Sequence, residues 1–296
     1  MSAAAAVFRR PARLAAAGCA LALAALACLP AAAQDAPARK AFRVCQDPNN
    51  LPFSSVKGEG YENRIAELFA QDLGLPVEYY SFPQRLAFVR NTLRYKLPGE
   101  DYRCDIVMGV PEGFGQVLST KAYYRSTYAL VIPQGRGLDQ VRSAQDLLAL
   151  DAGRRGKLRI GVYDRSPASQ WLTKHGLVDN GVPYPMMSPD PDHYPGQIIE
   201  RDLAEGRLDA AIVWGPIAGY FAHRVKQPAL QVVPLQSEPG VRFDYPMAMG
   251  VRHGEGEWKR QIEALIDKHR PRIHAILQEY GVPVVEDGVL ATTSSR

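Results

Sequence analysis

The chain has 296 residues, of which 46% are hydrophobic and 22% charged, with a formal net charge of +4. Arg9, Arg10 and Arg13 precede the apolar run Leu14–Leu29 and the small residues Ala31–Ala33, a pattern typical of a secretory signal peptide over the first 33 residues. Without that segment, 32 basic residues remain against 31 acidic ones, a net charge of +1. With a net charge so close to zero, there is no argument from charge for a nucleic-acid partner.

The signal peptide predicts export to the periplasm. Cys28 at the end of the apolar run raises a lipoprotein alternative, but the preceding Ala25–Ala27 is a poor context for lipid attachment. No later stretch approaches the roughly 18 apolar residues that a membrane span needs, so no span is expected in the mature protein. The mature chain is long enough for one large or two ordinary lobes.

Apolar periodicity and turn residues predict alternating strands and helices after the signal peptide. Ile65, Leu68 and Phe69 share one helical face, and Gly74 is a natural C-cap for that helix. Such alternation indicates a parallel sheet. The expected elements are strands at Phe42–Gln46, Val77–Phe82, Asp105–Val110 and Thr127–Ile132, and helices at Tyr61–Gly74 and Gln84–Leu93.

A second unit repeats this order. Ser166 is an expected N-cap, with Pro167 at the first position of a helix that ends at Gly176. The Pro-rich stretch Gly181–Pro195 has too many turn residues for regular structure and is expected to cover the surface of this unit. The remaining expected elements are a helix at Gly196–Gly206, strands at Leu208–Trp214, Leu230–Leu235 and Tyr245–Val251, and a helix at Glu257–Tyr280 broken at Pro271.

These elements predict an α/β fold of two lobes, each a mostly parallel sheet flanked by helices. The chain is expected to cross between the lobes near Ile132–Gly135 and near Leu235–Gly240, and two crossings make the double-strand hinge of a clamshell. Lobe I is expected to comprise residues 37–132 and 236–296, and lobe II residues 133–235.

Two cysteines, Cys45 and Cys104, remain after the signal peptide. In an oxidising compartment a lone pair favours a disulfide. Two free thiols are the alternative, because a cysteine late in one strand and another just before a neighbouring parallel strand can lie too far apart to bridge.

The familiar catalytic motifs are missing from the sequence: it has no Gly-x-Ser-x-Gly elbow, Walker loop, His-Glu-x-x-His or Cys-x-x-Cys. His269 and His274 are five residues apart with a proline between them, which does not stack two imidazoles on one metal. Asp190, Asp192 and His193 lack the further carboxylates that a hard cation needs. We expect no metal, no cofactor and no catalytic residue.

Aromatic residues at strand ends are the strongest candidates for a binding site. Open α/β sheets place their ligand crevice at the carboxyl ends of the strands. An ordinary core position explains any one of these residues, but several from both units facing one gap favour a cleft. The candidates are Phe53, Phe82, Tyr123, Tyr163 and Trp214, together with the turn residues Asn49 and Asn50 and the carboxyl of Glu112.

Several stretches resemble known families. Val44–Phe53, Asp105–Val110 and Leu208–Pro216 resemble type 2 periplasmic substrate-binding proteins of amino-acid uptake systems, and this resemblance covers nearly all of the mature chain. Its closer resemblance is to the MxaJ/XoxJ family, periplasmic proteins encoded beside PQQ-dependent methanol dehydrogenases. The stretches that carry it are Cys45–Ser54, Gly60–Leu93 and Cys104–Pro111. The resemblance implies a quinoprotein dehydrogenase of the calcium or lanthanide type as partner, with its cytochrome c as a further candidate.

The chain departs from the amino-acid binders at both ligand anchors. Those relatives hold the substrate carboxylate with an Arg after the strand at Asp105, whereas residues 110–120 here contain no Arg or Lys. They hold the ammonium with an acid five residues after the Asp-Ala of the second lobe, and that position, counted from Asp209, is Trp214. A zwitterion that enters the cleft would lose the free energy of its hydration without gaining charged partners in exchange. Free amino acids are therefore not the expected ligands.

These observations predict a non-enzymatic, monomeric accessory protein of methanol oxidation that assists maturation or activation of the dehydrogenase. The alternative is a solute-binding receptor of an ABC uptake system for a small apolar or non-amino-acid ligand. A third possibility, dehydration of a cyclic carboxylic acid with Glu112 as the acid, lacks the cation that must hold the substrate carboxylate.

Overall fold

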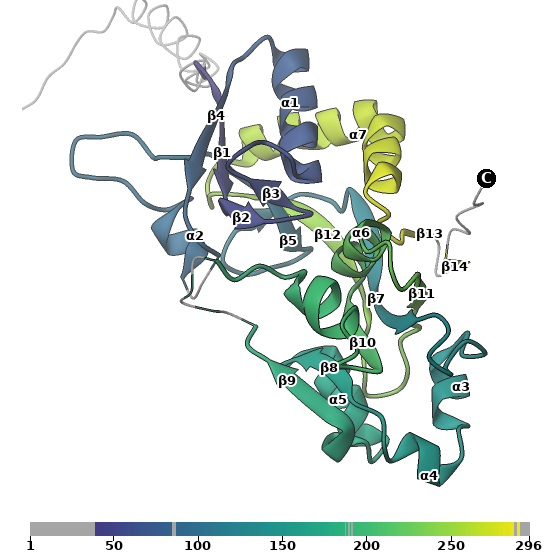
Figure 1. Cartoon of the computed structure of the whole chain (residues 1–296). Coiled ribbons are helices and arrows are strands. Elements are labelled where there is room, and N and C mark those ends of the chain that lie inside the picture. Colours follow the sequence, from purple (N-terminus) through teal and green to yellow (C-terminus); the bar gives the residue numbers. More distant parts are fainter. Residues whose placement is uncertain are drawn as a thin grey trace, which may run out of the picture. The chain divides into compact units, whose positions relative to one another are not determined.

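The structure is a computed structural model that describes residues 39–84, 87–186, 188, 190, 192–286 and 289–290. The predicted signal peptide and Cys28 lie outside these residues. The largest sheet has ten strands, and its main path runs β4-β1-β5-β12-β7-β10-β8-β9 (Figure 1). No helix among the described residues is long and apolar enough to cross a membrane.

The elements before the middle of the chain are β1 (Phe42–Gln46), β2 (Asn49–Asn50), β3 (Ser54–Ser55), α1 (Tyr61–Leu73), β4 (Val77–Ser81), α2 (Phe88–Asn91), β5 (Ile106–Pro111), β6 (Leu118–Ser119) and β7 (Tyr124–Pro133). The next are α3 (Ala144–Leu148), α4 (Ala152–Arg155), β8 (Ile160–Tyr163), α5 (Pro167–Lys174), the short 3-10 helix Val178–Asn180, β9 (Gly181–Tyr184), the π-helix Ile198–Leu203, β10 (Ala210–Trp214), α6 (Gly215–Arg224) and β11 (Leu230–Pro234). The last are β12 (Asp244–Val251), α7 (Gly256–Glu279), β13 (Val285–Glu286) and β14 (Val289–Leu290).

The sheet is mixed. Parallel pairing is found where the predicted strand–helix–strand units lie, in β4-β1-β5 and in β10-β8-β9. The long strands β12 and β7 join these two groups by antiparallel pairing. Strand β7 changes partners along its length, because residues up to Thr127 pair with β12 and residues from Tyr128 onward pair with β10 and β11.

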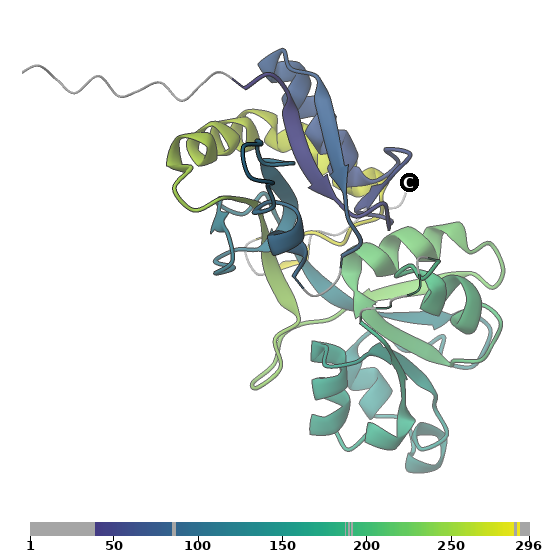
Figure 2. The same ribbon diagram turned by 90° about the vertical axis from the view of Figure 1, so that its left-hand side faces the viewer.

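Separate apolar cores form on the two sides of this change. One core gathers α1 and α7 over β1 and β5, with Phe42, Phe69 and Trp258 in edge and tilted ring contacts. The cores on the other side involve β8, β10, α5 and α6, and include the buried Trp171 and Phe221. In Figure 2 the purple, blue and yellow elements accordingly gather in one part and the teal and green elements in another.

Three local predictions were wrong, and the backbone explains the first of them. The helix expected at Gln84–Leu93 is reduced to α2, because Ala87 has a left-handed backbone (φ 70°) that a helix cannot contain. Helix α7 continues through Pro271, which lies inside it. Part of the Pro-rich stretch forms β9, which pairs in parallel with β8.

The disulfide prediction is confirmed. Cys45 lies in β1 and Cys104 just before β5, and their Cα atoms are 5.3 Å apart, within bridging distance. The two strands are direct neighbours, with Cys45 opposite Val107, so the sheet itself brings the cysteines together.

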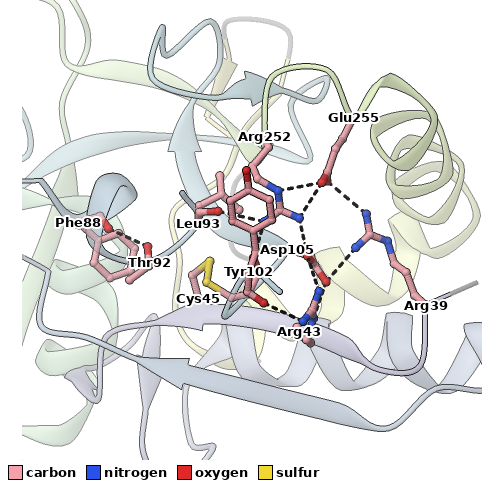
Figure 3. The surroundings of a disulfide bond; sticks show 11 residues. Arg39, Arg43, Cys45, Phe88, Thr92, Leu93, Tyr102, Asp105, Arg252 and Glu255 are labelled. Atoms are coloured by element: carbon pink, nitrogen blue, oxygen red, sulfur yellow. Dashed lines mark hydrogen bonds and ion pairs between the residues drawn. A yellow bond between two sulfur atoms is a disulfide. The ribbon is translucent and has the colours of Figure 1, made fainter. Parts of the chain in front are cut away.

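Beside the disulfide lies a buried carboxyl surrounded by arginines (Figure 3). Asp105, only 1% exposed, accepts from Arg43 Nε at 2.8 Å and pairs with Arg39 at 2.8 Å and with Arg252. Arg252 also donates to the Cys104 carbonyl at 2.6 Å. Burial acts to raise the pKa of Asp105, but the hydrogen bonds from Arg43 and Arg252 and the charge of Arg39 hold it below its usual range.

Candidate binding cleft

A cleft of about 500 Å³ opens where the carboxyl ends of strands from both parallel groups meet, a size typical of ligand sites. Its walls come from the loop after β1, from β2, from the ends of β5, β8 and β10, and from the segment after β9. The described lining residues are Asp47, Pro48, Asn49, Asn50, Phe53, Pro83, Gln84, Pro111, Tyr128, Tyr163, Met186, Ser188, Asp190, His193, Pro195, Trp214 and Ile217.

The wall that carries Phe53 is held by the start of α1. The backbone N–H of Tyr61 donates to Pro52 O and that of Glu62 donates to Phe53 O, both at 2.9 Å. Gly60 makes this contact possible, since a Cβ there would come within 2.0 Å of Phe53 O. The Phe53 ring then lies 5.6 Å from that of Tyr61. This aromatic wall is therefore fixed in place by the fold.

Polar groups order the loop in front of Phe53. The Asp47 carboxylate accepts from the backbone N–H of Asn49 at 2.8 Å and from that of Gln84. The Asn50 amide donates to the Gln84 side-chain oxygen at 2.7 Å. These hydrogen bonds connect the loop after β1 to the segment after β4. They also occupy both carboxylate oxygens of Asp47.

The opposite wall is aromatic. The half-buried Trp214 ends β10, and its ring lies 5.4 Å from Tyr128 and 6.0 Å from Tyr245 in T-shaped contacts. The Tyr163 hydroxyl donates to Pro195 O at 2.6 Å, which ties β8 to the segment after β9. Burial raises the pKa of Tyr128 and Tyr163 above the usual phenol range, so both hydroxyls are neutral at physiological pH.

None of the described residues that line this cleft is Lys or Arg. Asp47 and Asp190 are the lining carboxylates, and His193 is the lining imidazole. The absence of a basic anchor, expected from residues 110–120, thus extends over the described cleft wall. Such a surface does not suit a free carboxylate. Nor do three or more His, Cys, Asp or Glu side chains gather anywhere in the described part of the chain in a way that could hold a metal.

The structure brings five of the eight candidate residues together: Asn49, Asn50, Phe53, Tyr163 and Trp214 all line the cleft. The other three lie elsewhere. Tyr123 is buried in the core against Tyr124, at a ring distance of 4.8 Å. Glu112 is exposed and accepts from the Ala122 N–H at 3.2 Å. Phe82 follows β4, where its N–H donates to Gln46 O, and is not among the lining residues.

Three lining residues that the sequence did not single out are Tyr128, Ile217 and Asp47. Tyr128 lies within β7, where antiparallel pairing places it opposite Trp214 at the end of β10 and so beside the cleft. Ile217 belongs to the first turn of α6. Asp47 directly follows β1, a position that the same rule about carboxyl ends could have identified.

A smaller cavity of about 180 Å³ adjoins the cleft and shares Asp47, Asn50, Phe53, Gln84 and Pro111 with it. The half-buried carboxyl of Glu62, from the first turn of α1, also lines this cavity. Burial, and secondarily the charge of Asp47, raise the pKa of Glu62 to about 8.

A mixed sheet with two parallel groups, two connecting strands and a cleft between strand ends defines a two-lobed periplasmic binding protein, as the sequence predicted. The solved structure of the periplasmic binding protein XoxJ from Methylobacterium extorquens AM1 has a TM-score of 0.66 and 35% identity, covering 83% of this chain and all of that one. MxaJ from Methlophaga aminisulfidivorans MPT has a TM-score of 0.68 and 22% identity, covering 82% of this chain and all of that one.

Among curated proteins, MoxJ from Methylorubrum extorquens is 29% identical over 294 residues, which is 89% of this chain and 91% of that protein. No protein-family model matches the chain. The chain belongs to the MxaJ/XoxJ family of periplasmic binding proteins. This confirms the resemblance drawn from the sequence.

Proposed function

We propose that this protein is a non-enzymatic periplasmic accessory protein of PQQ-dependent methanol oxidation, and that its cleft binds a segment of the quinoprotein dehydrogenase during maturation or activation. The family supports the choice of partner. In this proposal the chain is monomeric, residues 37–132 and 236–296 make lobe I, residues 133–235 make lobe II, and residues 1–33 direct export.

The observation that carries the proposal is the chemistry of the cleft wall. Aromatic side chains from both parallel groups face one opening that has no basic anchor among its described residues. Aromatic anchors in a recessed, partly desolvated surface are the usual hot spots of protein recognition. A Trp offers a flat apolar face and a single N–H donor, which suits an inserted protein side chain better than a zwitterion.

Capture from periplasm tests the proposal. The tagged protein is expected to retain the dehydrogenase, and a strain without this protein is expected to accumulate inactive dehydrogenase. Trp214→Ala should weaken capture at least tenfold, the effect of losing about 1.4 kcal/mol. Tyr220→Ala is the matched control, because Tyr220 is also a half-buried aromatic but does not line the cleft. Normal dehydrogenase activity in the deletion strain, with no capture, would overturn the proposal.

The second candidate is a receptor for a small apolar or alcohol-like solute, favoured by the cleft volume of about 500 Å³. Thermal-shift measurements with metabolites separate the two functions. A single small molecule that raises the melting temperature by several degrees at micromolar concentration would favour the receptor.

A further inference from the structure

The small cavity beside the cleft contains a carboxyl group, that of Glu62, for which the described residues supply no partner. None of the hydrogen bonds or ion pairs among the described residues reaches the Glu62 carboxyl, and no described lining residue of this cavity is Lys, Arg or His. The backbone N–H of Glu62 is occupied by Phe53 O, so the helix start is satisfied without the side chain. The carboxyl therefore has no evident part in holding the fold together.

Gly109 in β5 makes room for this carboxyl. A Cβ at position 109 would lie 2.3 Å from Glu62 Oε1, closer than any side chain allows. The backbone of Gly109 is outside the left-handed region, so its conformation does not require glycine. The space that glycine leaves is the space that the Glu62 carboxyl occupies.

The surroundings of Glu62 favour a positive charge. Among the described residues, Asp47 is the charged group that faces it, and the nearby Tyr61, Tyr123 and Tyr124 have pKa values raised by burial, so their hydroxyls stay neutral. With a pKa of about 8, the Glu62 carboxyl is protonated at neutral pH until a cation enters and displaces that proton.

The dimensions of the cavity limit the kind of cation. Its volume of about 180 Å³ equals roughly six water molecules at about 30 Å³ each. That accommodates the end of a lysine side chain, a compact ammonium on a flexible alkyl stem. Phe53, Phe88 and Met247 line the cavity and provide apolar surface for the stem, and an aromatic ring also attracts a cation.

We infer that the cavity at Glu62 is a pocket for an alkylammonium group, filled by a lysine side chain of the partner segment that lies in the adjoining aromatic cleft. This inference rests on the proposed function for the source of the lysine. The shared wall at Asp47, Asn50 and Phe53 lets one chain segment occupy both spaces. The carboxylates of Asp47 and Asp190 on the described cleft wall match a basic segment.

Calorimetric titration with n-butylammonium tests the pocket. The wild type should bind it, with an affinity that rises up to tenfold per pH unit from about pH 6 to 8 and then levels, because one proton leaves as the cation enters. Glu62→Gln should weaken binding at least tenfold. Gly109→Ala should also weaken butylammonium binding at least tenfold, although the Glu62 carboxyl is still present. The uncharged n-butanol should not bind measurably. The matched control is Glu67→Gln, an exposed glutamate on the same helix.

The source of the ammonium is tested with purified dehydrogenase. Butylammonium should compete with the dehydrogenase, and Glu62→Gln should weaken dehydrogenase binding at least tenfold while Glu67→Gln does not. Equal butylammonium binding by the wild type and Glu62→Gln would overturn the pocket. If butylammonium binding depends on Glu62 but neither butylammonium nor Glu62→Gln affects dehydrogenase binding, the pocket does not hold a lysine of the dehydrogenase. That result would point to a free amine as the ligand. If the wild type binds butylammonium but never the dehydrogenase, the proposed function fails and the ammonium pocket stands.

Discussion

Asp105 is a buried carboxyl group and Glu62 a half-buried one, and their surroundings shift the two pKa values in opposite directions. Asp105 is surrounded by Arg39, Arg43 and Arg252, and its pKa is lowered. Glu62 faces a cavity with no cation among the described residues, and its pKa is raised. Where a buried charge serves the fold, the chain supplies the counter-charge itself. Where the described residues supply none, as at Glu62, we propose that the partner comes from another molecule.

Removal of the Asp105 charge should have the largest effect. Asp105→Asn leaves Arg252, itself 8% exposed, without its buried counter-ion. The expected loss is about 3–5 kcal/mol of unfolding free energy, measured by urea denaturation. Because the pKa of Asp105 is lowered in the folded state, its contribution is present above the unfolded pKa of about 3.9 and is lost as the pH falls through the folded value. A loss of less than about 1 kcal/mol would show that this network is not structural.

Loss of the disulfide should follow in size. Cys45 and Cys104 are 59 residues apart in sequence, and Cys45 also lines the small cavity. The double substitution to Ala should lower the unfolding free energy by about 2–4 kcal/mol, because the unfolded chain gains freedom. The single substitutions should cost about as much as the pair. A double variant as stable as the wild type would contradict a structural role for the bridge.

Glu62→Gln should have the opposite sign from Asp105→Asn. A pKa raised from 4.5 to about 8 means that the unfolded state ionises first, so wild-type stability falls as the pH rises from about 4.5 through about 8. The variant escapes this penalty. Above pH 8 the variant should be more stable than the wild type by about 2 kcal/mol of unfolding free energy. This is less than the free energy that corresponds to the full pKa shift, because the Glu62 side chain is only half-buried. Near pH 4 the two should unfold alike. A destabilised variant at pH 8 would place Glu62 among the structural carboxylates.

The smallest effect is expected at Tyr163 on the cleft wall. Tyr163→Phe removes the hydrogen bond to Pro195 O and should cost about 0.5–1.5 kcal/mol in thermal unfolding. Tyr245→Phe, which removes the more exposed bond to Arg242 O, is a suitable comparison. A loss of stability as large as that of Asp105→Asn would mean that the cleft wall serves to stabilise the fold rather than to bind a partner.

Much of the fold could be predicted because its signals are local. Strand β1 has the predicted bounds, and α1 begins at Tyr61 and is capped by the left-handed Gly74 as expected. These outcomes follow from apolar periodicity and from glycine's freedom of conformation. The left-handed Ala87, which shortens α2, gives no such signal, since alanine favours helices when tertiary context is ignored.

The site was less predictable because its residues come together through distant parts of the chain. Tyr163 and Trp214 are predictable because they end the strands β8 and β10, and Phe53 because it lies in the segment that follows β1. Tyr123 was expected at a strand end as well, but it lies just before the start of β7 and is buried in the core. Glu62 is an ordinary acidic residue in a first helical turn, and the role that we propose for it depends on the space left by Gly109, 47 positions later.

Calorimetric titration of the purified dehydrogenase into this protein tests the central claim most directly, with the wild type, Trp214→Ala and Tyr220→Ala measured side by side. The proposed function predicts a saturable complex for the wild type and Tyr220→Ala, and a dissociation constant at least tenfold higher for Trp214→Ala. No heat of binding for the wild type, or equal affinities for all three proteins, would contradict binding of the dehydrogenase through the aromatic cleft.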